Sequence, residues 1–239
     1  MVTDGNRLAD IGTDHGYIPI YLCQTGKIPS ALAMDIGKGP LQQAQTHIAE
    51  HGLSEQIKTR LSDGMAALQF GEADTILIAG MGGGLVMKIL SEGAEKLTGK
   101  EELILQPQSE IALVREFLRV RNFQILNEDM ILEDGKYYPM MRVHYQAEKN
   151  EDADKTIKDM ENSKEQKKSR YKVECLYGRY LLMEKNPVLH QYLVKERQVF
   201  ENILDNLFKQ PESEKITARI GEVKESLGYN EAALAYYRT

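Results

Sequence analysis

The first 145 residues alternate between short apolar runs and stretches whose apolar positions recur with helical spacing. Strands that alternate with helices in this way build βαβ units, so the pattern predicts an α/β fold with a mostly parallel sheet. The predicted strands are residues 7–10, 30–35, 58–61, 75–79, 102–106, 123–130 and 136–145. The predicted helices are residues 40–52, 84–97 and 109–121, together with one that begins near His15.

The last two predicted strands lie close together and are joined across Glu133-Asp134-Gly135. Asp-Gly is typical of the tight turns that connect antiparallel strands. The sequence therefore predicts an antiparallel hairpin added to the edge of the parallel sheet.

The pattern changes near residue 146. Residues 147–172 are highly charged and nearly free of large apolar side chains, which favours a linker or a solvated helix. Two apolar stripes at helical spacing follow, separated by Pro211, and they predict an antiparallel helical hairpin with coiled-coil-like packing. The predicted domains are 1–146, 147–172 and 173–239. The stripes consist of Leu189, Leu193, Phe200, Ile203 and Leu207, and of Ile216, Ile220, Val223 and Leu227.

Composition fits a soluble protein with a real core, because 42% of the 239 residues are hydrophobic and 28% are charged. No apolar run is long enough to span a membrane, and the first residues lack the pattern of a signal peptide. The two cysteines, Cys23 and Cys175, fit no metal spacing and no disulfide framework. We therefore expect a cytoplasmic protein without a metal site.

Charge is unevenly distributed along the chain. The net charge of −6 excludes a molecule that is basic as a whole, although phosphates respond to local charge. Residues 1–147 hold 13 basic and 19 acidic residues, whereas residues 148–239 hold 17 of each. The more basic part contains a cluster that is either a solvated face or an RNA-binding surface: Lys164, Lys167, Lys168, Arg170 and Lys172.

The turn after the first predicted strand carries the first candidate chemistry, within "LADIGTDHGYIPI" at residues 8–20. Gly12 would let the backbone approach a ligand closely. The glycines at 12 and 16 do not fit the three-glycine NAD fingerprint, and Asp10 and Asp14 would repel a pyrophosphate. They would attract the amino group and sulfonium of S-adenosylmethionine (SAM). A tight turn that binds nothing remains the alternative.

The next two strands also end in acids. Asp35 follows Asp10 by 25 residues and stands where a carboxylate can accept hydrogen bonds from both ribose hydroxyls of an adenosine. Asp63 follows the third strand, where a carboxylate can accept from the adenine amine, with Gly64 and Met65 near the ring. Each acid alone could be an ordinary solvated residue, but the series after successive strands is far more specific.

The fourth predicted strand opens into glycines at Gly80, Gly82, Gly83 and Gly84, with Met81 among them. The segment is no Walker loop, because Gly-Lys-Ser/Thr does not follow. It would leave room for a flat substrate beside the methyl donor. Gln106 and Pro107 end the fifth strand at the same rim.

Together these motifs resemble the bacterial tRNA adenine-N1 methyltransferases that modify adenine 22, the TrmK family. The resemblance covers residues 8–145 and rests on "ADIGTDHGYIPI", "ALAMDIGKGPLQQA", "LSDGMAAL", "ILIAGMGG", "LILQPQ" and "EDGKYYPMMR". It continues in "YGRYLLMEKNPVLHQYLVKE" at residues 177–196. Generic methyltransferases show neither the Asp-His of the first turn nor the Ala-Gly-Met-Gly-Gly after the fourth strand.

The resemblance implies a class I SAM-dependent methyltransferase fold (Rossmann-like) plus a C-terminal helical domain that helps to hold tRNA. It implies that Asp10, Gly12, Asp14 and His15 line the methionine end of SAM, that Asp35 holds the ribose, and that Asp63, Gly64 and Met65 lie by the adenine. It also implies that Gly80, Met81, Gly82 and Gly83 form the floor for the target base.

The sequence departs from the family pattern in three places. It begins a few residues before the first strand, where the family usually has a helix and a loop, so the true start would lie upstream or activity would be reduced. The charged segment is longer than usual, and Arg179 replaces an expected proline.

Adenine N1 has a free lone pair at neutral pH, so we expect positioning and electrostatics, and no general base, to carry catalysis. We expect a monomer that binds the tRNA phosphates with basic residues. Besides the charged cluster, the candidates are Arg119 and Arg121, and also Arg115, Lys136 and Arg142. The rival readings are a SAM methyltransferase for another RNA or a small molecule, and an RNA-binding protein that has lost catalysis.

Overall fold

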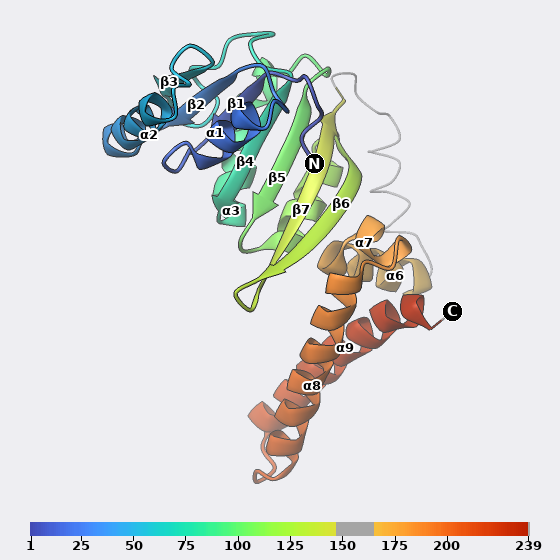
Figure 1. Cartoon of the computed structure of the whole chain (residues 1–239). Helices are drawn as coiled ribbons and strands as arrows, with labels where there is room; N and C mark the ends of the chain where they lie inside the picture. The colour runs from blue at the N-terminus through green and yellow to red at the C-terminus, as the bar shows by residue number, and fades with distance from the viewer. Residues whose placement is uncertain (147–164, 239) are drawn as a thin grey trace. The chain divides into compact units, whose positions relative to one another are not determined.

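The computed structural model describes residues 1–146 and 165–238 (Figure 1), with side chains in the second stretch from residue 169 on. The described chain divides into two compact units. The sheet unit contains Met1–Asn127 and residues 140–146, and the helical unit contains Glu128–Pro139 and residues 165–238. The tip of the predicted hairpin, Glu128–Pro139, thus groups with the helices. The predicted domain boundary at residue 146 assigns the whole hairpin to the first domain.

The sheet unit is built on a seven-stranded sheet with the strand order β3-β2-β1-β4-β5-β7-β6. The first five strands are parallel, and β7 pairs with β5 in the antiparallel direction. The carboxyl ends of the parallel strands therefore share one edge, the carboxyl edge, and their amino ends share the opposite edge, the amino edge. The strands are β1 (Leu8–Ile11), β2 (Ala31–Asp35), β3 (Ile57–Leu61), β4 (Thr75–Met81), β5 (Glu102–Pro107), β6 (Phe123–Glu133) and β7 (Lys136–Tyr145).

Helices cover both faces of the sheet because each central strand is apolar on both sides. Ile11, Ile76 and Leu103 pack in one core with residues of α3 and α4. Leu8 and Leu77 pack in the other with residues of α1 and α2. Continuous apolar runs of this kind are typical of buried parallel strands. The helices are α1 (Tyr17–Gln24), α2 (Lys38–Glu50), α3 (Gly83–Gly93) with a 3-10 turn η1 (Ala94–Lys96), and α4 (Ile111–Val120).

The predicted elements all occur, with ends that differ from the prediction by at most four residues. The hairpin prediction is confirmed, because β6 and β7 are joined through Asp134 and Gly135, which have φ angles of 48° and 75°. Two consecutive residues with positive φ make the turn that matches the twist of paired strands. The α/β fold, the mostly parallel sheet and the antiparallel edge are therefore as predicted.

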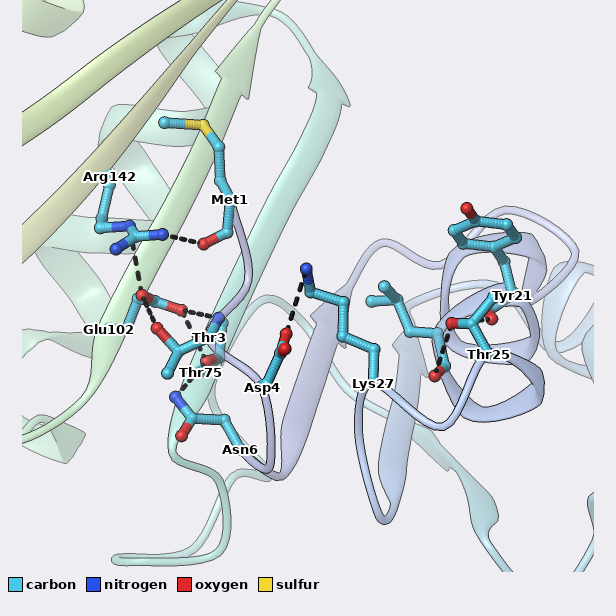
Figure 2. Close-up of polar contacts among 11 residues, drawn as sticks. Met1, Thr3, Asp4, Asn6, Tyr21, Thr25, Lys27, Thr75, Glu102 and Arg142 are labelled. Carbon is cyan, nitrogen blue, oxygen red and sulfur yellow. Dashed lines mark hydrogen bonds and ion pairs between the residues drawn. The ribbon is translucent and has the colours of Figure 1, made fainter.

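The amino edge is held by a polar network around Glu102, at the start of β5 (Figure 2). Its carboxylate accepts hydrogen bonds from the Thr3 backbone N–H (3.0 Å), the Thr3 hydroxyl (2.8 Å) and the Thr75 hydroxyl (2.9 Å). Arg142 adds an ion pair at 3.3 Å and also donates to the Met1 carbonyl. The Asn6 amide donates to the Thr75 hydroxyl at 2.9 Å. The network ties the segment before β1 to β4, β5 and β7.

The helical unit contains two long helices, α8 (Pro187–Phe208) and α9 (Glu214–Leu234), joined by a turn that includes Pro211, as the predicted hairpin requires. Asn186 caps α8 by accepting from the Val188 and Leu189 backbone N–H groups. The predicted stripes supply Leu189, Leu193 and Val223 to the buried positions, and Leu204 joins them. The unit also contains α6 (Glu165–Tyr177), α7 (Arg179–Met183) and the 3-10 turn η2 (Ala235–Tyr237).

The charged segment 147–172, predicted to be a linker or a solvated helix, is helical in the part that the structure describes. Residues 147–164 lie outside the described residues, and α6 begins at Glu165 and continues beyond the predicted segment. The sequence left the linker and the helix as alternatives because the first residues of α6 are all charged or polar. Its apolar anchors, Val173 and Tyr177, come only in its last two turns, where both are buried.

A buried polar cluster joins α6, α8 and α9. The Glu196 carboxylate accepts hydrogen bonds from Tyr177 Oη (2.7 Å), Tyr192 Oη (2.8 Å) and Asn230 Nδ2 (2.9 Å). The same Asn230 amide donates to the Leu193 carbonyl at 3.0 Å. Burial, followed by the Glu196 charge, raises the pKa of both Tyr177 and Tyr192 above their ordinary range. Both phenols therefore stay protonated as donors, and the cluster fixes how the three helices pack.

Candidate functional site

The turn after β1 lies at the carboxyl edge and is shaped by its glycines. The Gly12 and Thr13 N–H groups donate to the Met34 carbonyl of β2, at 2.7 and 2.8 Å. Gly12 and Gly16 have φ angles of 74° and 71°, which residues with a Cβ rarely adopt. Helix α1 begins at Tyr17, close to the predicted start at His15.

Gly12 also makes room for a side chain from β4. A Cβ on Gly12 would lie 2.0 Å from the Cε atom of Met81. The structure thus brings together two motifs that are about 70 residues apart in the sequence. The predicted turn and the predicted target-base floor share one location at the carboxyl edge.

Asp10 is the most unusual ionisable group of this edge. It lies on β1 with only 5% of its surface exposed. Burial raises the pKa of Asp10 to about 6, and the charge of Asp35 adds to the shift. Keeping a buried carboxylate ionised costs free energy, and binding of a cationic ligand beside it would offset that cost.

Three further carboxylates stand at this edge. Asp35 ends β2, and its Oδ1 accepts the Gly37 N–H at 2.6 Å, while the Ser62 N–H donates to its backbone carbonyl. Asp63 follows β3 and is exposed. Asp14, in the first turn, has 85% of its side chain exposed. The carboxylates predicted for the cofactor therefore lie at the ends of three neighbouring strands.

An aromatic group beside the first turn was not foreseen from the sequence. His15, Tyr17 and His47 stack with ring centroids 5.3 to 5.5 Å apart. Tyr17 is 60% exposed, and the buried Nδ1 of His15 has no hydrogen-bond partner among the described residues. Since His47 comes from α2, sequence spacing gave no signal for this cluster.

The glycine segment after β4 is held by the end of β5. The Gly80 N–H donates to Gln106 Oε1 at 2.9 Å, with Gly80 at φ 77°. This bond fixes the orientation of the amide, so Gln106 Nε2 points elsewhere. That nitrogen is buried and has no acceptor among the described residues. A buried donor without an acceptor at this edge suggests a ligand atom as its partner.

The other glycines of this segment have a packing role. A Cβ on Gly83 would lie 2.5 Å from the Ser109 carbonyl oxygen, and one on Gly82 would lie 3.2 Å from Ser109 Oγ. The Gly84 N–H donates to Glu110 Oε2 at 2.9 Å. Gly82 and Gly83 thus allow α3 to begin close to the segment before α4, and of the four residues predicted for the target-base floor only Gly83 is buried.

Gly64 and Met65 also differ from the expectation of a cofactor wall. The Met65 side chain is only 1% exposed and belongs to the main core. It packs against Gly93 of α3, where an added Cβ would lie 2.2 Å from its Cε. Gly64 packs against Ile89.

The basic residues predicted for RNA are distributed over both units. Arg119 and Arg121 are exposed on and after α4, and Arg121 lies over the Phe117 ring. Arg170 pairs with Glu174 at 3.0 Å, and Lys172 is exposed. Lys164 lies outside the described residues, as do the side chains of Lys167 and Lys168. Of the further candidates, Arg115 is buried and Arg142 is engaged at the amino edge, so neither is available to phosphates.

The carboxylates at the carboxyl edge fit SAM. Asp10, Asp14, Asp35 and Asp63 provide acceptors for a cationic amino group, a ribose and an adenine amine, and they disfavour a pyrophosphate. Across the part of the chain that the structure describes, no group of His, Cys, Asp and Glu side chains could hold a metal ion. None of the helices there is long and apolar enough to cross a membrane.

Comparison with known proteins agrees with this geometry. Residues 1–141 match a family model described as a methyltransferase domain. The tRNA (adenine(22)-N(1))-methyltransferase of Bacillus subtilis (strain 168) is 32% identical over 226 residues, which cover 95% of this chain and 89% of that protein.

Solved structures are similar over nearly the whole chain. The crystal structure of the B. subtilis M1A22 tRNA methyltransferase TrmK is 31% identical, covers 98% of this chain and 94% of its own, and has a TM-score of 0.76. Streptococcus pneumoniae Sp1610 in complex with S-adenosyl-L-methionine is 33% identical, covers 94% of both chains and has a TM-score of 0.70. Because residues 1–141 match the methyltransferase domain and the B. subtilis enzyme is 32% identical over 95% of this chain, the chain belongs to the bacterial tRNA (adenine-22-N1)-methyltransferase family, TrmK.

Proposed function

We propose that this protein transfers a methyl group from SAM to N1 of adenine 22 in tRNA. The observation that carries the proposal is the series of carboxylates at the ends of β1, β2 and β3, on a chain that resembles a curated enzyme of this activity over 95% of its length. The series suits a ligand with a cationic head and an adenosine tail.

Each carboxylate has a separate task in this proposal. Asp35 would accept from the ribose hydroxyls through Oδ2, because its Oδ1 is engaged by Gly37. Asp63 would accept from the adenine amine. Asp10 and Asp14 would attract the amino group at the methionine end, where the turn at Gly12 gives close backbone access. When bound, SAM supplies an electrophilic methyl group on a sulfonium.

The residues around the target base would position it and stabilise charge. N1 of adenine attacks with its own lone pair, so no side chain has to remove a proton first. Gln106 Nε2 would donate to an acceptor of the adenine ring, and exposed Tyr17 would offer its flat face. As N1 gains the methyl group, the ring becomes cationic, and the acids of the edge would stabilise the growing positive charge.

The tRNA must also present its base. Taking a base out of its stack costs roughly a few kcal/mol, which phosphate contacts have to offset. We assign these contacts to Arg119 and Arg121 and to the basic cluster at residues 164–172. Because tRNA is the substrate, we place the protein in the cytoplasm and expect it to act as a monomer.

The test is transfer of labelled methyl from SAM to unmodified tRNA with adenine at position 22, compared with the same tRNA carrying guanine there. We expect label only in the adenine substrate. Equal labelling would contradict the site, and labelling of a small molecule in the absence of tRNA would contradict the substrate class. No labelling with SAM still bound would indicate a binding-only protein.

A further inference from the structure

The helical unit contains a groove that none of the candidate contacts above uses. It is a hollow of about 240 Å³ lined by His190, Val194 and Arg197 from α8 and by Leu234, Tyr237 and Arg238 from the end of the chain. The three α8 residues are four and three positions apart, so they lie on one face of that helix. The size is below the roughly 300–1,000 Å³ typical of sites for drug-sized ligands, which limits the occupant to a small group.

The groove combines two aromatic rings with positive charge. The rings of His190 and Tyr237 stack with centroids 4.6 Å apart, and Tyr237 Oη donates to the Asn186 carbonyl at 3.0 Å. Burial raises the pKa of Tyr237 to about 12, so it remains a neutral donor. Leu234 is buried, and Val194 is exposed at the side. Arg197 and Arg238 add two guanidinium groups.

We propose that this groove binds one unpaired nucleotide of the tRNA, with the base against the His190–Tyr237 rings and the phosphate at Arg197 and Arg238. Aromatic faces stack bases of any sequence, and guanidinium groups hold phosphate oxygens through two parallel hydrogen bonds. The inference rests on the proposed tRNA substrate and adds contact residues that do not belong to the basic cluster at residues 164–172.

A neighbouring acid makes the proposal testable in two directions. Glu201 pairs with Arg197 at 2.8 Å, one helical turn further along α8, with both side chains about two-fifths exposed. A phosphate at Arg197 therefore has to compete with the Glu201 carboxylate. Removing the arginine should weaken RNA binding, whereas neutralising the acid should strengthen it.

The experiment measures binding of unmodified tRNA to the full chain over a range of salt concentrations, together with steady-state methylation. For the double variant Arg197→Ala/Arg238→Ala we expect Kd and KM for tRNA to rise about 10-fold or more, with kcat and SAM affinity unchanged. The slope of log Kd against log salt should fall by one to two, since each lost phosphate contact removes close to one unit. Glu201→Gln should tighten tRNA binding about 2–5-fold.

The stacking part has its own pair of variants. Tyr237→Phe keeps the ring and should change tRNA affinity less than 3-fold, whereas His190→Ala/Tyr237→Ala should weaken it about 10-fold or more. If Tyr237→Phe lost as much tRNA affinity as the double variant, the effect would come from the Tyr237 hydroxyl, which holds the end of the chain, and not from the rings. That result would overturn the stacking part of the proposal.

The matched control is Arg219→Ala on α9. Arg219 also pairs with a nearby acid of its own helix, Glu222 at 2.7 Å, but it lies outside the groove. If Arg219→Ala weakened tRNA binding as much as the groove variants do, the groove would contribute only unspecific positive charge. That result would overturn the proposal. So would unchanged affinity and salt slope in the double arginine variant. Failure of the wild-type chain to methylate tRNA would contradict the proposed function instead, so the two failures are distinguishable.

Discussion

The two edges of the sheet treat polar groups in opposite ways. At the amino edge, Glu102 is surrounded by donors and pairs with Arg142, so its charge is satisfied within the protein. At the carboxyl edge, Asp10 is buried with a raised pKa, and Gln106 Nε2 has no partner among the described residues. One edge stabilises the fold, and the other holds groups whose partners a ligand would supply.

The largest effect that would test this comparison is at the amino edge. We expect Glu102→Ala to lower the free energy of unfolding by about 3 kcal/mol, because it leaves Arg142 and two threonine hydroxyls without their acceptor. Chemical denaturation measures this loss. The matched control is Glu55→Ala at an exposed ion pair, which should change stability by less than about 0.5 kcal/mol. A loss of SAM affinity in folded Glu102→Ala would show that the two edges are not independent.

The next effect is on activity, at the carboxyl edge. We expect Gln106→Met to lower kcat/KM for tRNA about 30-fold while SAM affinity stays the same, because the donor for the target base is gone. Gln106→Glu keeps an acceptor for the Gly80 N–H but not the donor, so it should lose a similar factor. Steady-state kinetics distinguishes this from a purely structural role, in which Gln106→Glu would retain full activity.

Replacing Asp10 should change stability in the opposite direction to replacing Glu102. Its pKa is about 6 in the folded chain against an ordinary 3.8, so the folded state binds more protons between these values and stability falls as pH rises through them. Asp10→Asn should therefore be as stable as wild type below pH 4 and more stable by up to about 2 kcal/mol above pH 6. It should also bind SAM more weakly.

Measuring the difference in unfolding free energy between Asp10→Asn and wild type at several pH values isolates this group from all others. A difference that is constant with pH would mean that Asp10 titrates normally. A variant that is less stable at every pH would mean that the carboxylate holds the turn and is not a strained group.

The smallest effect belongs to Asp74, at the amino edge before β4. Arg7 donates to it through its side chain and lowers the pKa of Asp74. Here the stabilisation is present at neutral pH and is lost as pH falls below the ordinary value. Because both side chains are more than two-fifths exposed, we expect Asp74→Asn to cost less than about 1 kcal/mol and the cost to shrink in high salt. A cost that is insensitive to salt would argue against a surface ion pair.

The sequence predicted the fold well because the strands carry their signal locally. Apolar runs, the Pro-to-Gly helix of residues 40–52 and the Asp-Gly turn each specify an element without help from distant residues. The acids of the carboxyl edge were also predictable, because parallel strands must end at one edge. Contacts between elements that are distant in the sequence could not be predicted. The burial of Arg115, the packing of Met65 on Gly93 and the rings of His15 and His47 depend on which helix faces which, and no local pattern encodes that.

The hairpin of β6 and β7 limits how freely this architecture can be exchanged between proteins. Its base belongs to the sheet unit, whereas its tip, Glu128–Pro139, belongs to the helical unit. At the tip, Met130 packs in the core of the helical unit, and Glu128 accepts the Tyr180 N–H at 3.1 Å. A chain cut at residue 146 would keep the tip and lose everything that buries it. The two units are therefore not modules that a single junction can recombine, and any chimaera with a related enzyme would have to take the hairpin tip and the helices from the same parent.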